Sequence, residues 1–183
     1  MIKLPYDTYE EIKKRIISIF VEYGVKTLPI DCFNLAKTMG FTLIPYSSLS
    51  KKKLKMIHRL SGGEGLTIAM FESEKKLIFF DDSTCEGRQR FTILHELGHY
   101  VLGHREESEI ANAQANFFAK YAIAPLPIVH VNQVRSRDEI VEMFGTSKEC
   151  AINVLDAYNK WLDNTSEYFT SYEVELLELF NLR

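Results

Sequence analysis

The chain has 183 residues, of which 46% are hydrophobic, and its formal net charge is −3. This length favours one core over several, and we expect a single domain over residues 1–183. The small negative charge gives no general attraction to nucleic acid or an anionic membrane, and no apolar run is long enough to span one. Three widely spaced cysteines without a Cys-x-x-Cys pair indicate neither a disulfide framework nor a thiolate zinc site. The first 20 residues are too charged for a signal peptide, so we expect a cytoplasmic protein.

The first half of the chain combines helical and strand patterns. Apolar spacing and turn residues predict a helix over residues 8–23, a second helix from 29 to 40, a strand over 41–45, and a hairpin of strands 66–71 and 76–80. If the edge of this hairpin is open, an extended substrate peptide could add to it through main-chain hydrogen bonds. The alternative is that the hairpin only caps the core.

A polar and basic stretch, residues 47–59, lies between these strands. Its cations are Lys51, Lys52, Lys53, Lys55 and Arg59. They could contact nucleic acid or an acidic substrate, but such a run is typical of a solvated surface. No aromatic residue interleaves with the five cations, which favours the surface interpretation.

The segment His95-Glu96-Leu97-Gly98-His99 carries the strongest chemical signal, within a helix predicted over residues 87–102. Residues four apart lie on one face of an α-helix, so both imidazoles can reach one metal ion while Glu96 flanks it. We expect His95 and His99 to bind Zn²⁺. Glu96 is then the general base, taking a proton from the water that the metal activates.

A chance match on an ordinary amphipathic helix is the alternative, and the surrounding residues argue against it. At about 100° per residue, His99 and Glu96 fall about 40° and 100° from His95. The apolar residues cluster on the other side, between about 160° and 260°; they are Ile93, Leu94, Leu97 and Val101. Gly98 lies between the two faces, where its missing side chain would permit the close approach of another element.

The helix predicted next, over residues 107–124, is rich in alanine, which allows close packing on its neighbour. It must also supply the third zinc ligand, because His104 would point about 180° away from His95 if the first helix continued. We expect His104 to mark the end of that helix instead.

A polar stripe on the alanine-rich helix offers candidates for the third ligand. Glu109, Asn112 and Asn116 follow one another at helical spacing, while Gln114 lies off the stripe. Glu109 is the strongest donor, because an ionised carboxylate binds zinc better than an amide oxygen. A solvated stripe without metal contact is the alternative.

Two segments together resemble the ImmA/IrrE family of bacterial metallopeptidases. They are residues 90–104 and the run Ala115-Asn116-Phe117-Phe118-Ala119 ahead of Pro125, within a likeness that covers about residues 60–130. The resemblance implies an α+β, zincin-like fold, mostly helical with a small antiparallel or mixed sheet. It also implies a cytoplasmic zinc metallopeptidase that cleaves a helix-turn-helix repressor of a prophage, another mobile element or a stress operon. The rival is an inactive binding protein of the same fold that regulates a repressor or toxin–antitoxin partner by contact.

Two positions depart from the family pattern. The family usually has glutamate where this chain has Asn112, and often an acid where it has Gln114. Three readings follow: Glu109 substitutes from one turn earlier, Asn112 coordinates weakly, or the metal site has decayed.

The C-terminal part is expected to be helical. We assign residues 1–124 to the catalytic core and 125–183 to a C-terminal helical extension, with a last helix over 172–180. Residues 138–152 have the rhythm of a helix-turn-helix. Because its second helix carries Glu149 and Asp156 beside Lys148, we expect this pair to pack on the core or bind a partner protein rather than contact DNA.

Overall fold

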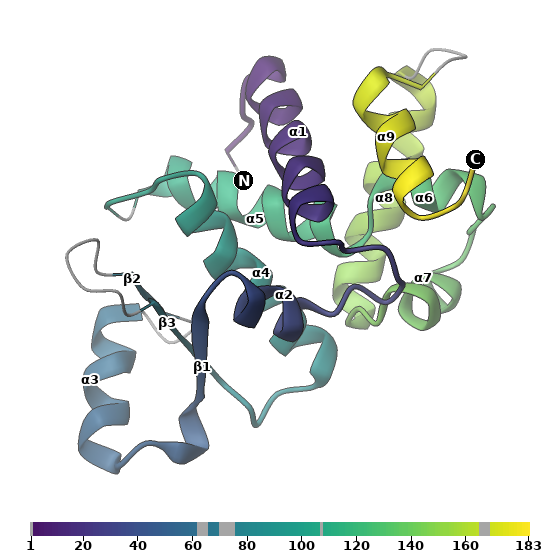
Figure 1. The fold of residues 1–183 in the computed structure, drawn as a ribbon. Coiled ribbons are helices and arrows are strands. Elements are labelled where there is room, and N and C mark those ends of the chain that lie inside the picture. Colours follow the sequence, from purple (N-terminus) through teal and green to yellow (C-terminus); the bar gives the residue numbers. More distant parts are fainter. Residues whose placement is uncertain (1, 62–65, 70–75, 107, 165–168) are drawn as a thin grey trace.

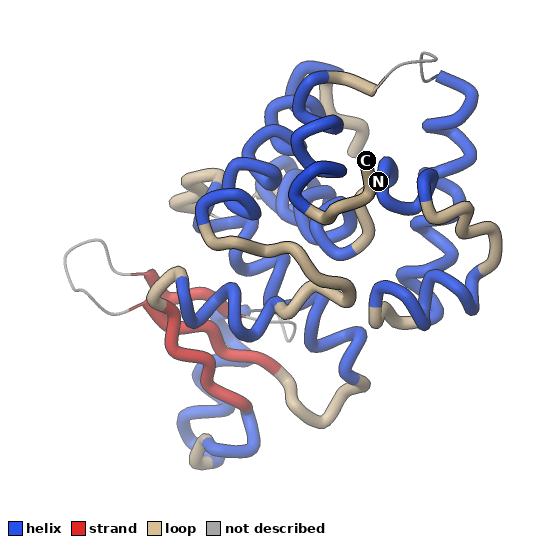
Figure 2. The backbone as a smooth tube through the Cα atoms, turned by 45° about the vertical axis from the view of Figure 1, so that its right-hand side comes forward, coloured by secondary structure: helices blue, strands red, loops and turns tan. Residues whose placement is uncertain are grey.

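A computed structural model describes residues 2–61, 66–69, 76–106, 108–164 and 169–183. Helices make up most of it, and three short strands gather at one side (Figures 1 and 2). The helices are α1 (Tyr6–Glu22), α2 (Cys32–Thr38), α3 (Lys51–Ser61), α4 (Glu86–Val101), α5 (Glu109–Ile123), α6 (Leu126–Val131), α7 (Arg137–Phe144), α8 (Lys148–Asn164) and α9 (Ser171–Leu179). The strands are β1 (Phe41–Pro45), β2 (Leu66–Ala69) and β3 (Lys76–Phe80).

The sheet is mixed, which confirms that part of the predicted fold class. The strand order is β1-β3-β2, with β3 parallel to β1 and antiparallel to β2. The strand over residues 41–45 is confirmed, and the hairpin strands pair as predicted. Residues 70–71, placed in the first hairpin strand, lie outside the described residues. In this sheet β2 is an edge strand, and it contacts α4.

The predicted helices are confirmed, most of them within two residues at each end. The helix expected from residue 29 begins instead at Cys32, because Asp31 caps it: Asp31 Oδ1 accepts a hydrogen bond of 2.9 Å from the Asn34 backbone N–H. The last helix, expected over residues 172–180, is α9. Among the described residues, no helix is both long and apolar enough to cross a bilayer.

The basic stretch folds into α3, a helix that the sequence analysis did not predict. Ile57 and Leu54 pack with Phe79 of β3 in a small second core, so α3 covers one face of the sheet (Figure 1). The five cations of the stretch are exposed. Their exposure agrees with a solvated surface.

The main core lies on the other side of the sheet and includes the C-terminal helices. Its buried residues come from most parts of the chain, from Leu4 to Phe180, and include Ile78 of β3. Helix α4 contributes the buried residues Ile93, Leu94 and Leu97. This is the core face predicted for the histidine helix.

Helices α4 and α5 pack closely, as predicted from glycine and alanine. A Cβ on Gly98 would lie 3.1 Å from Phe118 Cβ. Four alanines of α5 are fully or almost fully buried, namely Ala111, Ala115, Ala119 and Ala122. Small side chains on both helices therefore set their distance.

A second close contact fixes the start of α4. Helix α7 ends at Gly145, whose φ of +61° is a left-handed conformation that glycine adopts without strain. The next residues, Thr146 and Ser147, pass so close to Gly87 that any Cβ there would overlap their backbone. The N-terminal end of α8 is thereby held beside α4.

Candidate metal centre

The three residues of the predicted zinc motif lie on α4 at the edge of the core. His95 and Glu96 are 9% and 7% exposed, and His99 is half-buried. Their spacing places both imidazoles on one face of the helix. The Nε2 atoms of His95 and His99 lie 3.0 Å apart, so the two rings converge as predicted.

This convergence fits a divalent metal. Two bare nitrogen lone pairs repel each other at 3.0 Å, so the pair needs a proton or a cation between its Nε2 atoms. Zinc–imidazole bonds of about 2.0–2.1 Å in tetrahedral geometry separate the nitrogens by about 3.4 Å, only slightly more than observed. The donor chemistry and the spacing thus suit zinc.

Burial keeps both imidazoles neutral. It lowers the pKa of His95 to about 4, although the hydrogen bond with Asn116 acts in the opposite direction. Burial likewise lowers the pKa of His99 to about 4, helped by the neighbouring His95 and His104. At neutral pH both rings are therefore in the form that can donate a lone pair to a metal.

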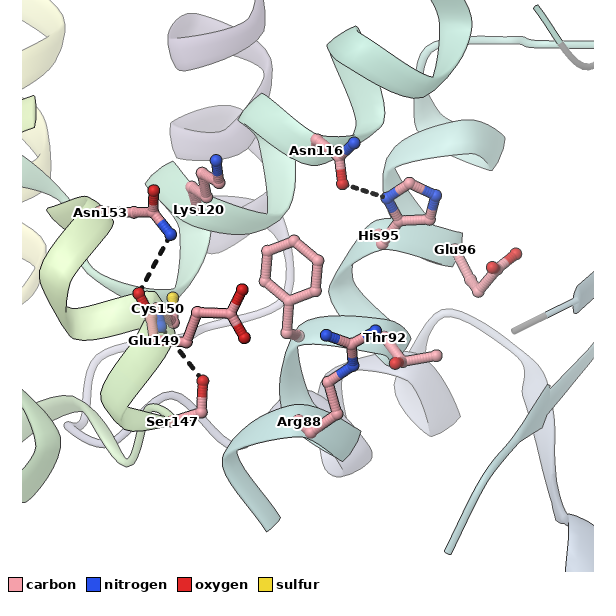
Figure 3. A pocket seen from close by; sticks show the side chains of 11 residues that line it. Arg88, Thr92, His95, Glu96, Asn116, Lys120, Ser147, Glu149, Cys150 and Asn153 are labelled. Atoms are coloured by element: carbon pink, nitrogen blue, oxygen red, sulfur yellow. Dashed lines mark hydrogen bonds between the residues drawn. The ribbon is translucent and has the colours of Figure 1, made fainter. Parts of the chain in front are cut away.

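The polar stripe of α5 faces these two rings. Asn116 Oδ1 lies 3.1 Å from His95 Nδ1 (Figure 3). The other ring nitrogen of His95, Nε2, is the one that faces His99. One turn earlier, Asn112 lies close enough to His99 for its side chain to raise the pKa of that ring. These two asparagines of the stripe therefore lie beside the histidine pair.

The candidate third ligands differ in position. Glu109 is the first residue of α5, directly after the N-cap Ser108, and its side chain is exposed. A carboxylate there suits the positive end of the helix. Within the described ranges, no three His, Cys, Asp or Glu side chains converge on one point. The structure therefore brings Asn112, and not Glu109, to the histidine pair.

His104 and Gln114 belong to the same cluster, which sequence reasoning missed. His104 Nδ1 lies 3.1 Å from His99 Nδ1, and its Nε2 lies 2.7 Å from Gln114 Oε1. The helix does end before His104, as expected, and the turn at Gly103 brings the His104 ring back onto His99. The signal was Gly103, a typical residue for terminating a helix by a reversal of the chain.

A cavity of about 320 Å³ opens beside His95 and Glu96. Figure 3 shows side chains from three helical segments around it. Helix α4 contributes Arg88, Phe91 and Thr92, α5 contributes Asn116 and Lys120, and the start of α8 contributes Ser147, Glu149, Cys150 and Asn153. The cavity is therefore mixed in charge and adjoins the candidate base.

The helix-turn-helix rhythm corresponds to α7, the Gly145 turn and α8. Ser147 Oγ accepts a hydrogen bond from the Cys150 backbone N–H and so caps α8. Glu149 and Asn153, in the first turns of α8, line the cavity. The turns that would read bases in a DNA-binding protein thus border the candidate site, in agreement with the expected packing on the core.

The fold and the site together define a class of protein. A helix with two converging imidazoles and a carboxylate, packed against a small mixed sheet, is an α+β fold of the zincin-like type. The sequence matches the IrrE N-terminal-like domain, peptidase family M78, over residues 42–155. The chain therefore belongs to the ImmA/IrrE family of metallopeptidases. A comparison with curated proteins gave no match.

Proposed function

We propose that the protein is a zinc-dependent metallopeptidase that hydrolyses a peptide bond in a specific partner protein. The observation that carries this proposal is the 3.0 Å separation of the His95 and His99 Nε2 atoms, beside Glu96. These two nitrogens would hold the metal, with the Asn112 amide as a weak third donor. When bound, zinc would polarise the scissile carbonyl and lower the pKa of a water molecule.

Glu96 is the residue assigned to proton transfer. Its carboxylate takes a proton from the attacking water and passes it to the nitrogen of the leaving amine as the C–N bond breaks. Glu96 is almost buried and lines the cavity, so it faces a partly enclosed space rather than bulk solvent. A substrate in that cavity would exclude water from the base.

Two features suit an extended peptide substrate. Strand β2 is at the sheet edge and contacts α4, so a peptide added along β2 would pass beside the histidine helix. The cavity next to Glu96 offers room for a substrate side chain, with Lys120 and Asn153 among its polar walls. Cleavage would therefore select unfolded or linker segments of the partner.

Family membership suggests the partner. We propose a cytoplasmic helix-turn-helix repressor of a mobile element or stress operon. The test is to incubate the protein with the repressor encoded beside its gene and to measure intact masses. Wild type should yield two fragments, and Glu96→Gln, which retains both imidazoles, should yield none. Equal cleavage by both proteins would contradict the role of Glu96.

A second function is favoured by one observation. Asn112 supplies a neutral amide where a strong third ligand would be a carboxylate, so the chain could be an inactive zincin-fold protein that regulates a repressor or toxin–antitoxin partner by contact. In the same incubation, this function predicts a stable complex of intact proteins with both wild type and Glu96→Gln. Fragments formed only by wild type would exclude it.

A further inference from the structure

The end of α4 explains why His104 lies over His99. The backbone N–H of His104 donates to the carbonyl of His99 at 3.0 Å, and that of Gly103 donates to Tyr100 at 3.1 Å. Gly103 has a φ of +72°. These three features are those of a Schellman motif, in which the residue after the glycine returns to the last helical turn. The backbone thus fixes which two rings meet.

A metal shared by His95 and His99 would determine which nitrogen of each neighbouring imidazole ring carries the proton. Both Nε2 atoms must then present lone pairs, so each of these rings carries its proton on Nδ1. The Nδ1–H of His95 has an acceptor in Asn116 Oδ1 at 3.1 Å. For His99, the atom facing Nδ1 is the Nδ1 of His104, which must be unprotonated to accept.

The same reasoning assigns the proton of His104 and its acceptor on α5. With a bare Nδ1, the neutral His104 ring carries its proton on Nε2, and that N–H requires an acceptor. Gln114 Oε1 lies 2.7 Å from His104 Nε2. The chain of hydrogen bonds is therefore complete from Gln114 through His104 to His99.

We infer that His104 and Gln114 are positioning residues, which hold the His99 ring in the Nδ1–H tautomer and direct its Nε2 at the metal. This inference rests on the zinc site of the proposed function, but not on peptidase activity. His104 is not a ligand in this arrangement, because it contacts the far nitrogen of His99. The Nδ1 atoms of the two ligands thus face different groups: that of His95 faces one amide, and that of His99 faces a second imidazole.

Zinc affinity tests the inference without any substrate. Removing the hydrogen-bond partner of a metal-binding histidine typically lowers the metal affinity about 10- to 100-fold. In competition with a chromophoric chelator, His104→Phe, which keeps a ring but removes the acceptor, should weaken zinc binding by about 10- to 100-fold. Gln114→Met, similar in size but without the amide, should weaken it by about tenfold, and Gln114→Glu, which keeps an acceptor, should not.

The matched control is His130→Phe. His130 lies on α6, and its Nδ1 is 3.0 Å from Tyr158 Oη, outside the metal cluster. This variant should leave zinc affinity unchanged. Thermal unfolding of each metal-free variant shows whether it remains folded, and Gln114→Met against Gln114→Glu decides the question if His104→Phe does not fold.

A tautomer measurement complements the affinities. Long-range ¹H–¹⁵N correlation spectra of the zinc-loaded protein should show His99 protonated on Nδ1 and His104 protonated on Nε2. A zinc-bound nitrogen on His104, or a proton on its Nδ1, would overturn the inference. So would a wild type that binds zinc with the same affinity as Gln114→Met and His104→Phe, and that outcome leaves the proposed function intact. A wild type that binds no zinc overturns both.

Discussion

Gly98 of α4 and Phe118 of α5 approach so closely that a Cβ on the glycine would lie 3.1 Å from the phenylalanine Cβ. This contact lies on the helix that carries both imidazoles. It holds α5 near enough for Asn116 to reach His95. The close packing of the two helices therefore positions residues of the candidate metal centre as well as of the core.

The first prediction concerns this contact. Gly98→Ala gains about 1 kcal/mol of helix propensity but overpacks the contact at a cost of about 1–3 kcal/mol, so we expect a net loss of about 1 kcal/mol in the free energy of unfolding. Urea denaturation measures it. Gly98→Ala should cost less in a Phe118→Ala background than in wild type, because alanine lacks the Cγ and Cδ1 atoms that the new Cβ would meet. A more stable Gly98→Ala would contradict the proposed close packing.

A second substitution should be more damaging. At Gly87 a Cβ would overlap the backbone of Thr146 and Ser147, which cannot rotate away as a side chain can. We expect Gly87→Ala to cost about 3 kcal/mol or more, since α8 must move off α4. The control is Glu86→Ala next to it, where the lost ion pair with Arg90 is exposed on one side and costs at most about 1 kcal/mol. Equal costs for the two substitutions would contradict this account.

The three cysteines should differ in reactivity. Burial raises the pKa of Cys32 to about 12 and that of Cys150 to about 11, whereas Cys85 is exposed. In the native protein at pH 8 a thiol reagent should modify one cysteine quickly, and the other two at least about 100-fold more slowly than an ordinary exposed thiol. Cys85→Ser should abolish the fast phase. Two fast phases in wild type would contradict the burial of Cys32 and Cys150.

Glu10 of α1 should contribute to acid sensitivity. Burial raises the pKa of Glu10, but hydrogen bonds from Lys13 and Tyr172 lower it more, so the pKa lies below its ordinary value of 4.5. A carboxyl group whose pKa is lower in the folded state stabilises the protein above about pH 4.5. This stabilisation is lost as the pH falls through the folded-state pKa.

The measurement is urea denaturation of the metal-free protein between pH 6 and 3. Glu10→Gln should lose less stability than wild type over the lower part of this range. The exposed neighbour Glu11 supplies the control, and Glu11→Gln should follow the wild-type curve. Identical curves for all three proteins would rule out the assigned contribution of Glu10.

Much of the fold and the central motif could be predicted from local patterns. The histidine helix was predicted because its apolar residues repeat at helical spacing and its two histidines lie four apart. The first strand was predicted with its observed ends because residues 41–45 lie between a glycine and a polar turn. Helix α3 was not predicted because cations dominate its sequence, so the helical spacing of Leu54 and Ile57, which pack on the sheet, was not recognised.

The remaining parts of the site depend on contacts between elements. Whether Glu109 or Asn112 meets His99 depends on how α5 is rotated against α4, which no periodicity specifies. That His104 ends the helix was predicted correctly, but its contact with His99 depends on the turn at Gly103, which helical spacing does not describe. The α8 side of the cavity depends on the absence of a side chain at Gly87, which lets the backbone of Thr146 and Ser147 pass close to α4. Each is a tertiary relationship between residues whose local patterns are ordinary.

The most direct test of the central claim is the metal content of the purified protein. Elemental analysis after dialysis against buffer containing zinc should give about one zinc per chain for wild type. His95→Ala should lose that zinc, and His130→Ala should keep it. Wild-type protein without zinc, or His95→Ala protein with a full equivalent, would contradict a metal centre formed by His95 and His99.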